Sequence, residues 1–262
     1  MTTRTEPSAA PPPDGRGGRL EVEVDRPAAE LLDDPFVLRV RGAGPDAKVV
    51  WRARFRDDDG RVWRATAERP EDLAAAWQPA KAGTGPVAGL RSLRPVAIDV
   101  RAEAADGRAA ARTLTRRLMA DGVRPRRWRD GLTATLYLPA GDAPSATLIA
   151  DATAGPAQAA VAALAGPLLA SRGVLVLALG PGRAPAAEAV AAARERLSAV
   201  PMATDEVHVL PVADPLAGDP PADAVVLPPG IGVREAAGRS AARAAAWDGL
   251  LARLGARPRA TG

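Results

Sequence analysis

The residue types that could perform acyl transfer or metal chemistry are scarce in this chain. His208 is the only histidine, and cysteine is absent. A serine or cysteine nucleophile needs a neighbouring base, most often histidine, and zinc sites use clusters of histidine and cysteine. Most hydrolytic and redox mechanisms therefore lack parts here, and we expect no catalytic residues, no metal site and no cofactor. His208 itself falls inside a predicted strand, where a lone histidine is more often packed or exposed than catalytic.

Four residues form a candidate ligand cleft. Asp151, Thr153 and Gly155 follow one predicted strand, and Asp214 follows another. Parallel α/β sheets place their ligand crevice at the carboxyl ends of the strands, and free amides at a helix start attract anions. The alternative for the segment 151–155 is an ordinary helix cap made by Asp151 or Thr153.

A second candidate, Ser240, lies in the segment Gly238-Arg239-Ser240-Ala241-Ala242. This segment superficially resembles a nucleophile elbow, but an elbow needs a strand directly before it. Residues 234–239 predict a helix instead, and no histidine follows Ser240. Ser240 is thus interpreted as a polar helix position, while a non-standard constellation of Asp151, Asp214 and Ser240 stays open as an enzymatic alternative.

Composition narrows the class of protein. Of 262 residues, 47% are apolar, which is enough for a substantial core, and the formal charge is +4 with both signs interspersed. A nucleic-acid footprint would cluster its basic residues, so no nucleic-acid partner is expected. The uncharged stretch 152–171 is rich in alanine and contains glycine and proline, which favours a packed helix over a membrane span. We expect a cytoplasmic protein with no membrane contact.

The elements that must position these residues fall into two expected domains. Residues 1–19 predict a disordered leader. Residues 20–119 predict an immunoglobulin-like β-sandwich, because six or seven short alternating segments are separated by turns such as Asp57 to Gly60 and Asp106-Gly107. Its expected core aromatics are Trp51, Phe55 and Trp63.

After an arginine-rich linker at 120–130, the periodicity changes. Strands are predicted over 132–138, 146–150, 174–179, 206–210 and 222–227, and helices over 156–171, 186–199 and 234–254. This alternation predicts a mainly parallel α/β layer over 131–262. The fold class expected overall is therefore α+β with two domains.

Several stretches together resemble the acyl-CoA thioesterase / bile acid-CoA:amino acid N-acyltransferase family. They are Asp34 to Gly42, Asp59 to Arg64, Gly89 to Pro95, Gly122 to Arg124, Gly131 to Pro139 and Leu168 to Leu179. The resemblance implies an N-terminal β-sandwich joined to an α/β-hydrolase domain. In that family a serine or cysteine nucleophile stands on a glycine-flanked elbow after a strand.

The resemblance breaks at the position of the nucleophile. The corresponding segment is Pro211-Val212-Ala213-Asp214-Pro215, with Ala213 in place of the nucleophile and prolines in place of both glycines. Proline fixes φ and removes amide donors, so neither the turn nor the main oxyanion donor is expected. The chain also ends at Gly262, before the family's later strands and its triad Asp and His, which predicts a truncated, degenerate hydrolase domain.

Three hypotheses follow. The first is a family relative, a pseudoenzyme, that has lost catalysis and keeps a binding or interaction role, with acyl-CoA or another small acyl compound as ligand. The second is an active acyl-CoA hydrolase or N-acyltransferase with a non-standard site. The third is a structural two-domain protein, in which a homodimer or a protein partner covers an incomplete sheet edge.

Overall fold

The computed structural model describes residues 18–25, 30–44, 46–81, 87–128, 131–215, 221, 223–227 and 239–258. The fold is mixed α+β, with three sheets and, in the described residues, three α-helices and one 3₁₀ helix. The leader predicted at 1–19 lies outside the described residues except for its last two positions. No helix within the described ranges is long and apolar enough to span a membrane.

All paired strands of the first unit are antiparallel, and one isolated parallel bridge joins Leu31 to Arg117. A ribbon of β1 (Glu21–Val24) and β2 (Leu38–Arg41) lies along a five-stranded sheet of order β5-β4-β3-β6-β7. The strands of that sheet are β3 (Val49–Arg56), β4 (Val62–Ala67), β5 (Gln78–Pro79), β6 (Val96–Ala104) and β7 (Ala109–Arg116), and the 3₁₀ helix η1 (Pro70–Ala75) follows β4. Buried and exposed residues alternate along β3 and β6, as one covered face requires.

The turns and the aromatic core of this unit match the sequence-based expectation. Gly60 and Gly107 take φ of 75° and 85° at the two predicted hairpin turns, a region that glycine enters without steric cost. Trp51, Phe55 and Trp63 are all buried. The rings of Phe55 and Trp63 stack with their centroids 6.1 Å apart.

The second unit contains a five-stranded mixed sheet of order β12-β10-β11-β9-β8. The strands β10 (Ala146–Asp151), β11 (Val174–Leu179) and β12 (Val207–Pro211) are parallel to one another. On the far side of β11, β9 (Ala134–Leu138) pairs antiparallel with β11, and β8 (Arg124–Trp128) pairs antiparallel with β9. Every residue of β11 is buried, which agrees with its uninterrupted apolar sequence. Helix α2 (Ala186–Leu197) covers one face of the sheet, and α1 (Pro156–Ser171) and α3 (Arg239–Arg253) cover the other.

Two sequence-based expectations need correction. The arginine-rich segment 120–130 is not a simple linker, because Arg124–Trp128 forms edge strand β8; an edge strand tolerates Pro125, whose missing amide can face solvent. The strand expected at 222–227 is reduced, in its described residues, to one parallel bridge between Val212 and Val225.

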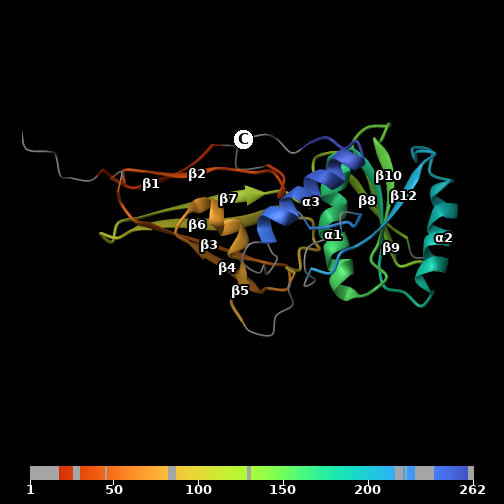
Figure 1. The fold of residues 1–262 in the computed structure, drawn as a ribbon, viewed down its shortest axis with the longest axis horizontal. Coiled ribbons are helices and arrows are strands. Elements are labelled where there is room, and N and C mark those ends of the chain that lie inside the picture. The colour runs from red at the N-terminus through yellow and green to blue at the C-terminus, as the bar shows by residue number, and fades with distance from the viewer. Residues whose placement is uncertain are drawn as a thin grey trace, which may run out of the picture.

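One continuous hydrophobic core joins the two units. It runs from the first sheet through α1 and α3 to one face of the second sheet, while a smaller cluster lies under α2. Figure 1 shows α1 and α3 between the two large sheets and α2 at the outer end of the elongated molecule. The face of α1 toward the first unit therefore borders the joint between the units.

Candidate functional site

The segment after β12, where a nucleophile elbow would stand, is extended. The last residue pair of β10 and β12 is Asp151 with Pro211, and the Val212 amide then donates to the Asp151 carbonyl at 2.9 Å. The Ala213 amide donates to the carbonyl of Val225 at 2.9 Å, and the Val225 amide donates back to Pro211 at 2.8 Å. The chain therefore continues as strand-like backbone instead of turning into a helix.

Backbone geometry supports the same conclusion. A nucleophile elbow is a sharp, strained turn, yet Leu93 is the only non-glycine residue with positive φ in the described ranges. Ala213 is half-buried in relaxed, extended backbone. An alanine side chain there offers no nucleophile, and the turn that would expose one is absent.

His208 lies in the middle of β12, opposite Leu148 of β10. It is partly buried, and its Nδ1 is 3.8 Å from a carboxylate oxygen of the exposed Glu206. This distance is too long for a hydrogen bond. Ser240 lies in the first turn of α3, but its side chain is outside the described part of the structure, so the constellation of Asp151, Asp214 and Ser240 stays a hypothesis.

The residues of the candidate ligand cleft are joined only in part. Asp151 Oδ1 accepts hydrogen bonds from the amide and hydroxyl of Thr153, at 3.0 and 2.6 Å. Gly155 is the N-cap of α1, and no side chain caps this helix; neither Asp151 nor Thr153 therefore serves as the expected cap. Asp214 is exposed and follows the last β10–β12 pair by three positions.

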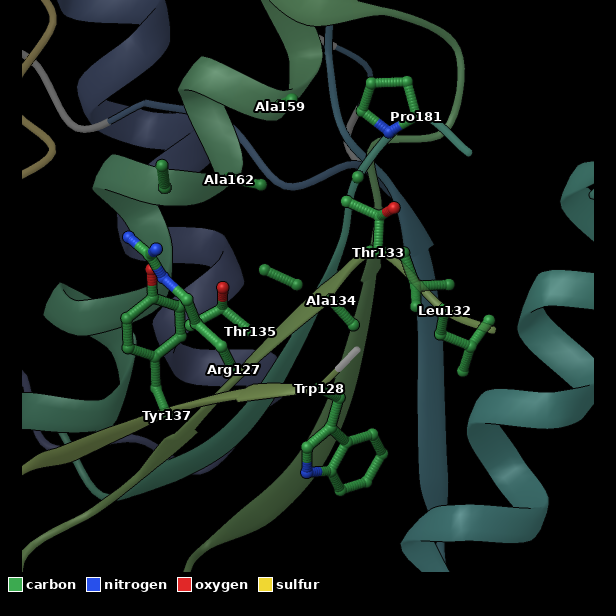
Figure 2. A pocket seen from close by; sticks show the side chains of 14 residues that line it. Arg127, Trp128, Leu132, Thr133, Ala134, Thr135, Tyr137, Ala159, Ala162 and Pro181 are labelled. Carbon is green, nitrogen blue, oxygen red and sulfur yellow. The ribbon is translucent and has the colours of Figure 1, made fainter. Parts of the chain in front are cut away.

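Two cavities flank the first turns of α1, and neither is lined by Asp151, Thr153, Gly155 or Asp214. The first, which we call the sheet cavity, has a volume of about 490 Å³ and lies between α1 and the strands β8, β9 and β11. Figure 2 shows its lining residues, among them Arg127, Thr135 and Tyr137. Gly180 and Pro181, which follow the carboxyl end of β11, also line it.

The second, which we call the joint cavity, has a volume of about 610 Å³. It lies where α1 faces the loop at 87–91 of the first unit, and its lining is mostly apolar. Two arginines border it, Arg61 and Arg91, and both form ion pairs with Asp59. Both cavities fall in the size range of small-molecule sites.

Sequence analysis missed the polar groups of the sheet cavity. Alternation along 132–138 does place Thr133, Thr135 and Tyr137 on one face of a strand, so that signal was present. It was overlooked because the arginine-rich segment was interpreted as a linker, whereas β8 pairs with β9 and sets Arg127 opposite Thr135.

A buried charge network joins the two units away from both cavities. Arg172, at the C-cap of α1, contacts Asp33 at 3.0 Å and Asp34 at 2.6 Å, and the indole of Trp247 donates to Asp33 at 3.1 Å. Burial raises the pKa of Asp33, and the ion pair with Arg172 opposes that rise. The carboxylates and the guanidinium are paired with one another, although the buried Nε of Arg172 has no hydrogen-bond partner. We interpret this network as structural, because it ties segments of both units together.

No protein-family model matches this chain, and no curated protein matches its sequence. Within the described residues no group of three or more histidine, aspartate or glutamate side chains is placed to hold a metal ion. The geometry of the β12 terminus and of the two cavities therefore carries the functional proposal.

Proposed function

We propose that this protein is a non-catalytic relative of the acyl-CoA thioesterases and acyltransferases, which binds an acyl ligand without cleaving it. The observation that carries the proposal is the end of β12. The family resemblance puts the nucleophile at Ala213, and the Ala213 amide donates to the carbonyl of Val225 in strand-like backbone.

The arrangement of the second sheet supports the relationship. In an α/β-hydrolase the oxyanion hole combines the amide after the nucleophile with one from the loop between a strand and the first helix. That geometry requires the strand before the loop to lie beside the nucleophile strand. Here β10, which leads through residues 152–155 into α1, is the direct neighbour of β12. This neighbourhood of β10 and β12 is the one that such a site would need, which supports the proposed relationship.

The joint cavity supports the choice of ligand. Its apolar wall combines Val87 and Leu90 from the first unit with alanines and Leu164 of α1, and apolar surface is what an acyl chain buries favourably. Arg61 and Arg91 at its border could meet an anionic head group, although Asp59 already neutralises part of their charge. Gly155, the N-cap of α1, directly precedes the lining residue Pro156.

The loss of catalysis is tested by thiol release from short, medium and long acyl-CoAs. We expect no release above buffer from the parent protein, and none from Ala213→Ser, because a hydroxyl on extended backbone lacks both the base and the turn. In a comparable hydrolase, removal of the catalytic unit costs about 10⁶-fold in kcat. If the parent protein turned over about one thioester per second, and His208→Ala or Ser240→Ala abolished this activity, the protein would be an active enzyme with a non-standard site.

Binding is tested by the thermal stability of the protein in the presence of the same acyl-CoAs. Ligand at about 100 times its Kd stabilises by about 2.7 kcal/mol, which is a clear rise in Tm. Ala160→Phe, which fills the joint cavity, should abolish the rise. Ala191→Phe, at an exposed position of α2, should leave it intact. An unchanged Tm of the parent protein with every acyl-CoA would contradict the binding role and favour a purely structural one.

A further inference from the structure

The polar groups of the sheet cavity gather on one face of β9. Ala134 and Leu136 pack in the cluster under α2, whereas Tyr137 belongs to the core on the α1 side. Since strand residues alternate between faces, Thr133 and Thr135 lie on the α1 side with Tyr137. Arg127 of β8 is paired with Thr135, and directly opposed residues share a face. Figure 2 shows Arg127 and Thr135 beside Tyr137, with Trp128 turned away from them.

Tyr137 is a largely buried residue that lines this cavity with its ring and hydroxyl. The residue is only 4% exposed, yet no hydrogen bond to its hydroxyl occurs among the described residues. Burial raises the pKa of Tyr137 to about 12, although the charge of Arg127 opposes the rise; the phenol is therefore protonated near neutral pH. The hydroxyl is not among the fully buried polar atoms that lack a partner; it lines the cavity as a donor for an acceptor that enters from solvent.

Arg127 supplies a positive charge at the same place. Its side chain is exposed, and no carboxylate in the described part of the chain pairs with it. The planar guanidinium has donors in a fork that matches the two oxygens of a carboxylate. Arg172, by contrast, is paired with two aspartates.

The opposite wall is small and apolar. Ala159, Ala162 and Ala163 of α1 face the strands across the cavity, and Leu179 and Pro181 close its end. A cavity of about 490 Å³ with one cation, three hydroxyls and an apolar wall suits a small molecule with one charged end. Phosphate is less well matched, since the first residues of α1, Pro156 and Ala157, do not line it and a single arginine is the only cation that does.

We infer that the sheet cavity binds a small organic acid, whose carboxylate is held by Arg127 and accepts a hydrogen bond from Tyr137. This site is separate from the joint cavity, although Ala159, Ala163 and Pro181 line both. The inference does not depend on the proposed function, because no acyl-CoA and no thioester chemistry enters it. A failure of acyl-CoA to bind would not contradict the organic-acid site, and a failure of organic acids to bind would not contradict the proposed function.

The experiment uses Tyr137 as its own reporter. It is the only tyrosine of the chain, so protein made with ¹³C at the tyrosine Cζ gives one NMR signal from the phenol carbon. This signal is followed during titrations with benzoate, with the neutral isostere benzamide and with inorganic phosphate. The test variant is Arg127→Gln, and the matched control is Arg126→Gln. Arg126 is paired with Leu136 and therefore lies on the other face of β8.

We expect benzoate to move the signal with saturation at a Kd of about 1 mM or tighter, a range that suits so small a ligand. Benzamide in place of benzoate, and Arg127→Gln, should each weaken binding by about tenfold or more, because each removes the forked charge pair. Phosphate should also bind about tenfold or more weakly, because it has no apolar part to bury against the alanines of α1. Arg126→Gln should change the Kd less than about twofold by the same argument. If Arg127→Gln does not fold, Arg127→Lys replaces it. Its affinity for benzoate should lie between the affinities of the parent protein for benzoate and for benzamide.

Three results would overturn the inference. The first is the absence of any shift with benzoate at about 20 times the expected Kd, where a site would be filled. The second is equal affinity for benzoate and benzamide. The third is binding that Arg127→Gln or Arg127→Lys leaves unchanged, or that phosphate matches.

Discussion

Gly166 illustrates how a single residue sets the width of an interface. It lies inside α1, and a Cβ added to it would stand 2.6 and 2.8 Å from two ring carbons of Tyr137. Such distances are too short for carbon atoms in contact. The glycine therefore lets α1 approach β9 closely enough to bury the tyrosine ring, at the helix-propensity cost that glycine carries in a helix.

Gly166→Ala should destabilise the protein despite the better helix former. Overpacking a tight site costs about 1–3 kcal/mol, against a gain of up to about 1 kcal/mol from helix propensity. Gly249→Ala is the matched control, because this glycine is in α3 and nothing lies within 4 Å of an added Cβ. That variant should be more stable than the parent by up to about 1 kcal/mol in urea unfolding. A stabilised Gly166→Ala would show that the ring of Tyr137 moves freely.

Among the elements, the β3–β4 hairpin organises the loop that lines the joint cavity. Asp57 is buried and accepts hydrogen bonds from the amide of Arg61 at 2.8 Å, the amide of Gly89 at 3.1 Å and the indole of Trp63 at 3.2 Å. The amide of Asp58 donates in turn to the carbonyl of Gly89 at 3.0 Å. The turn thus fixes the segment 87–91 against the sheet.

Asp57→Asn should remove part of this support in a pH-dependent way. Burial favours a higher pKa for Asp57, but the hydrogen bonds from Gly89, Arg61 and Trp63 outweigh it and lower the pKa below its ordinary value. A lowered folded-state pKa gives stability that is present above the unfolded-state pKa and is lost as the pH falls through the folded-state value. The variant should therefore be less stable than the parent by about 1–3 kcal/mol at neutral pH, and the difference should shrink in acid.

The measurement is urea unfolding at a series of pH values from neutral to below about pH 3.5, beneath the ordinary range of aspartate. Asp106→Asn in the other hairpin serves as control, since its carboxylate is half-exposed and bonds to Arg108, two positions further along the chain. The hydrogen bonds from Arg108 also lower the pKa of Asp106, but solvent screens this exposed pair. The effect of this variant should be clearly smaller. A deficit of Asp57→Asn that stays constant with pH would mean that the charge of Asp57 does not matter.

At the scale of the whole molecule, the buried network around Arg172 ties three distant segments together. Asp33 belongs to the first unit, Arg172 ends α1, and Trp247 belongs to α3. The carbonyl of Arg172 also accepts from the amide of Arg257, at 2.9 Å. These contacts accompany the continuous core, so the two units are expected to unfold together.

Arg172→Met should strongly destabilise the whole protein. It leaves Asp33 and Asp34 buried without their cation, and breaking a buried pair in this way costs about 3–5 kcal/mol. Arg54→Met removes an ion pair with Asp99 in which both side chains are more than half exposed, and exposed pairs contribute up to about 1 kcal/mol. Urea unfolding compares the two variants. Equal losses, or separate transitions for the two units in the parent protein, would contradict this account.

Local patterns in the sequence were enough to determine part of this protein. The alternation along β3 and β6 and the apolar run of β11 predicted these strands, because side-chain periodicity is set by the backbone geometry of a strand itself. Ala213 between prolines ruled out a nucleophile elbow by residue type alone. Pairs of residues that are far apart in the sequence, such as Arg172 and Asp33, gave no local signal of this kind.

The tertiary structure decided the rest, because it depends on contacts between segments far apart in the chain. Arg172 and Asp33 are 139 positions apart, and nothing near either residue indicates the other. The arginine-rich segment became an edge strand only because β9 offered it a partner. That pairing set Arg127 opposite Thr135 and beside Tyr137, while Gly166 let α1 come close to the ring. The sheet cavity is thus a product of packing, whereas the absence of a serine or cysteine from the segment 211–215 is a property of the sequence itself.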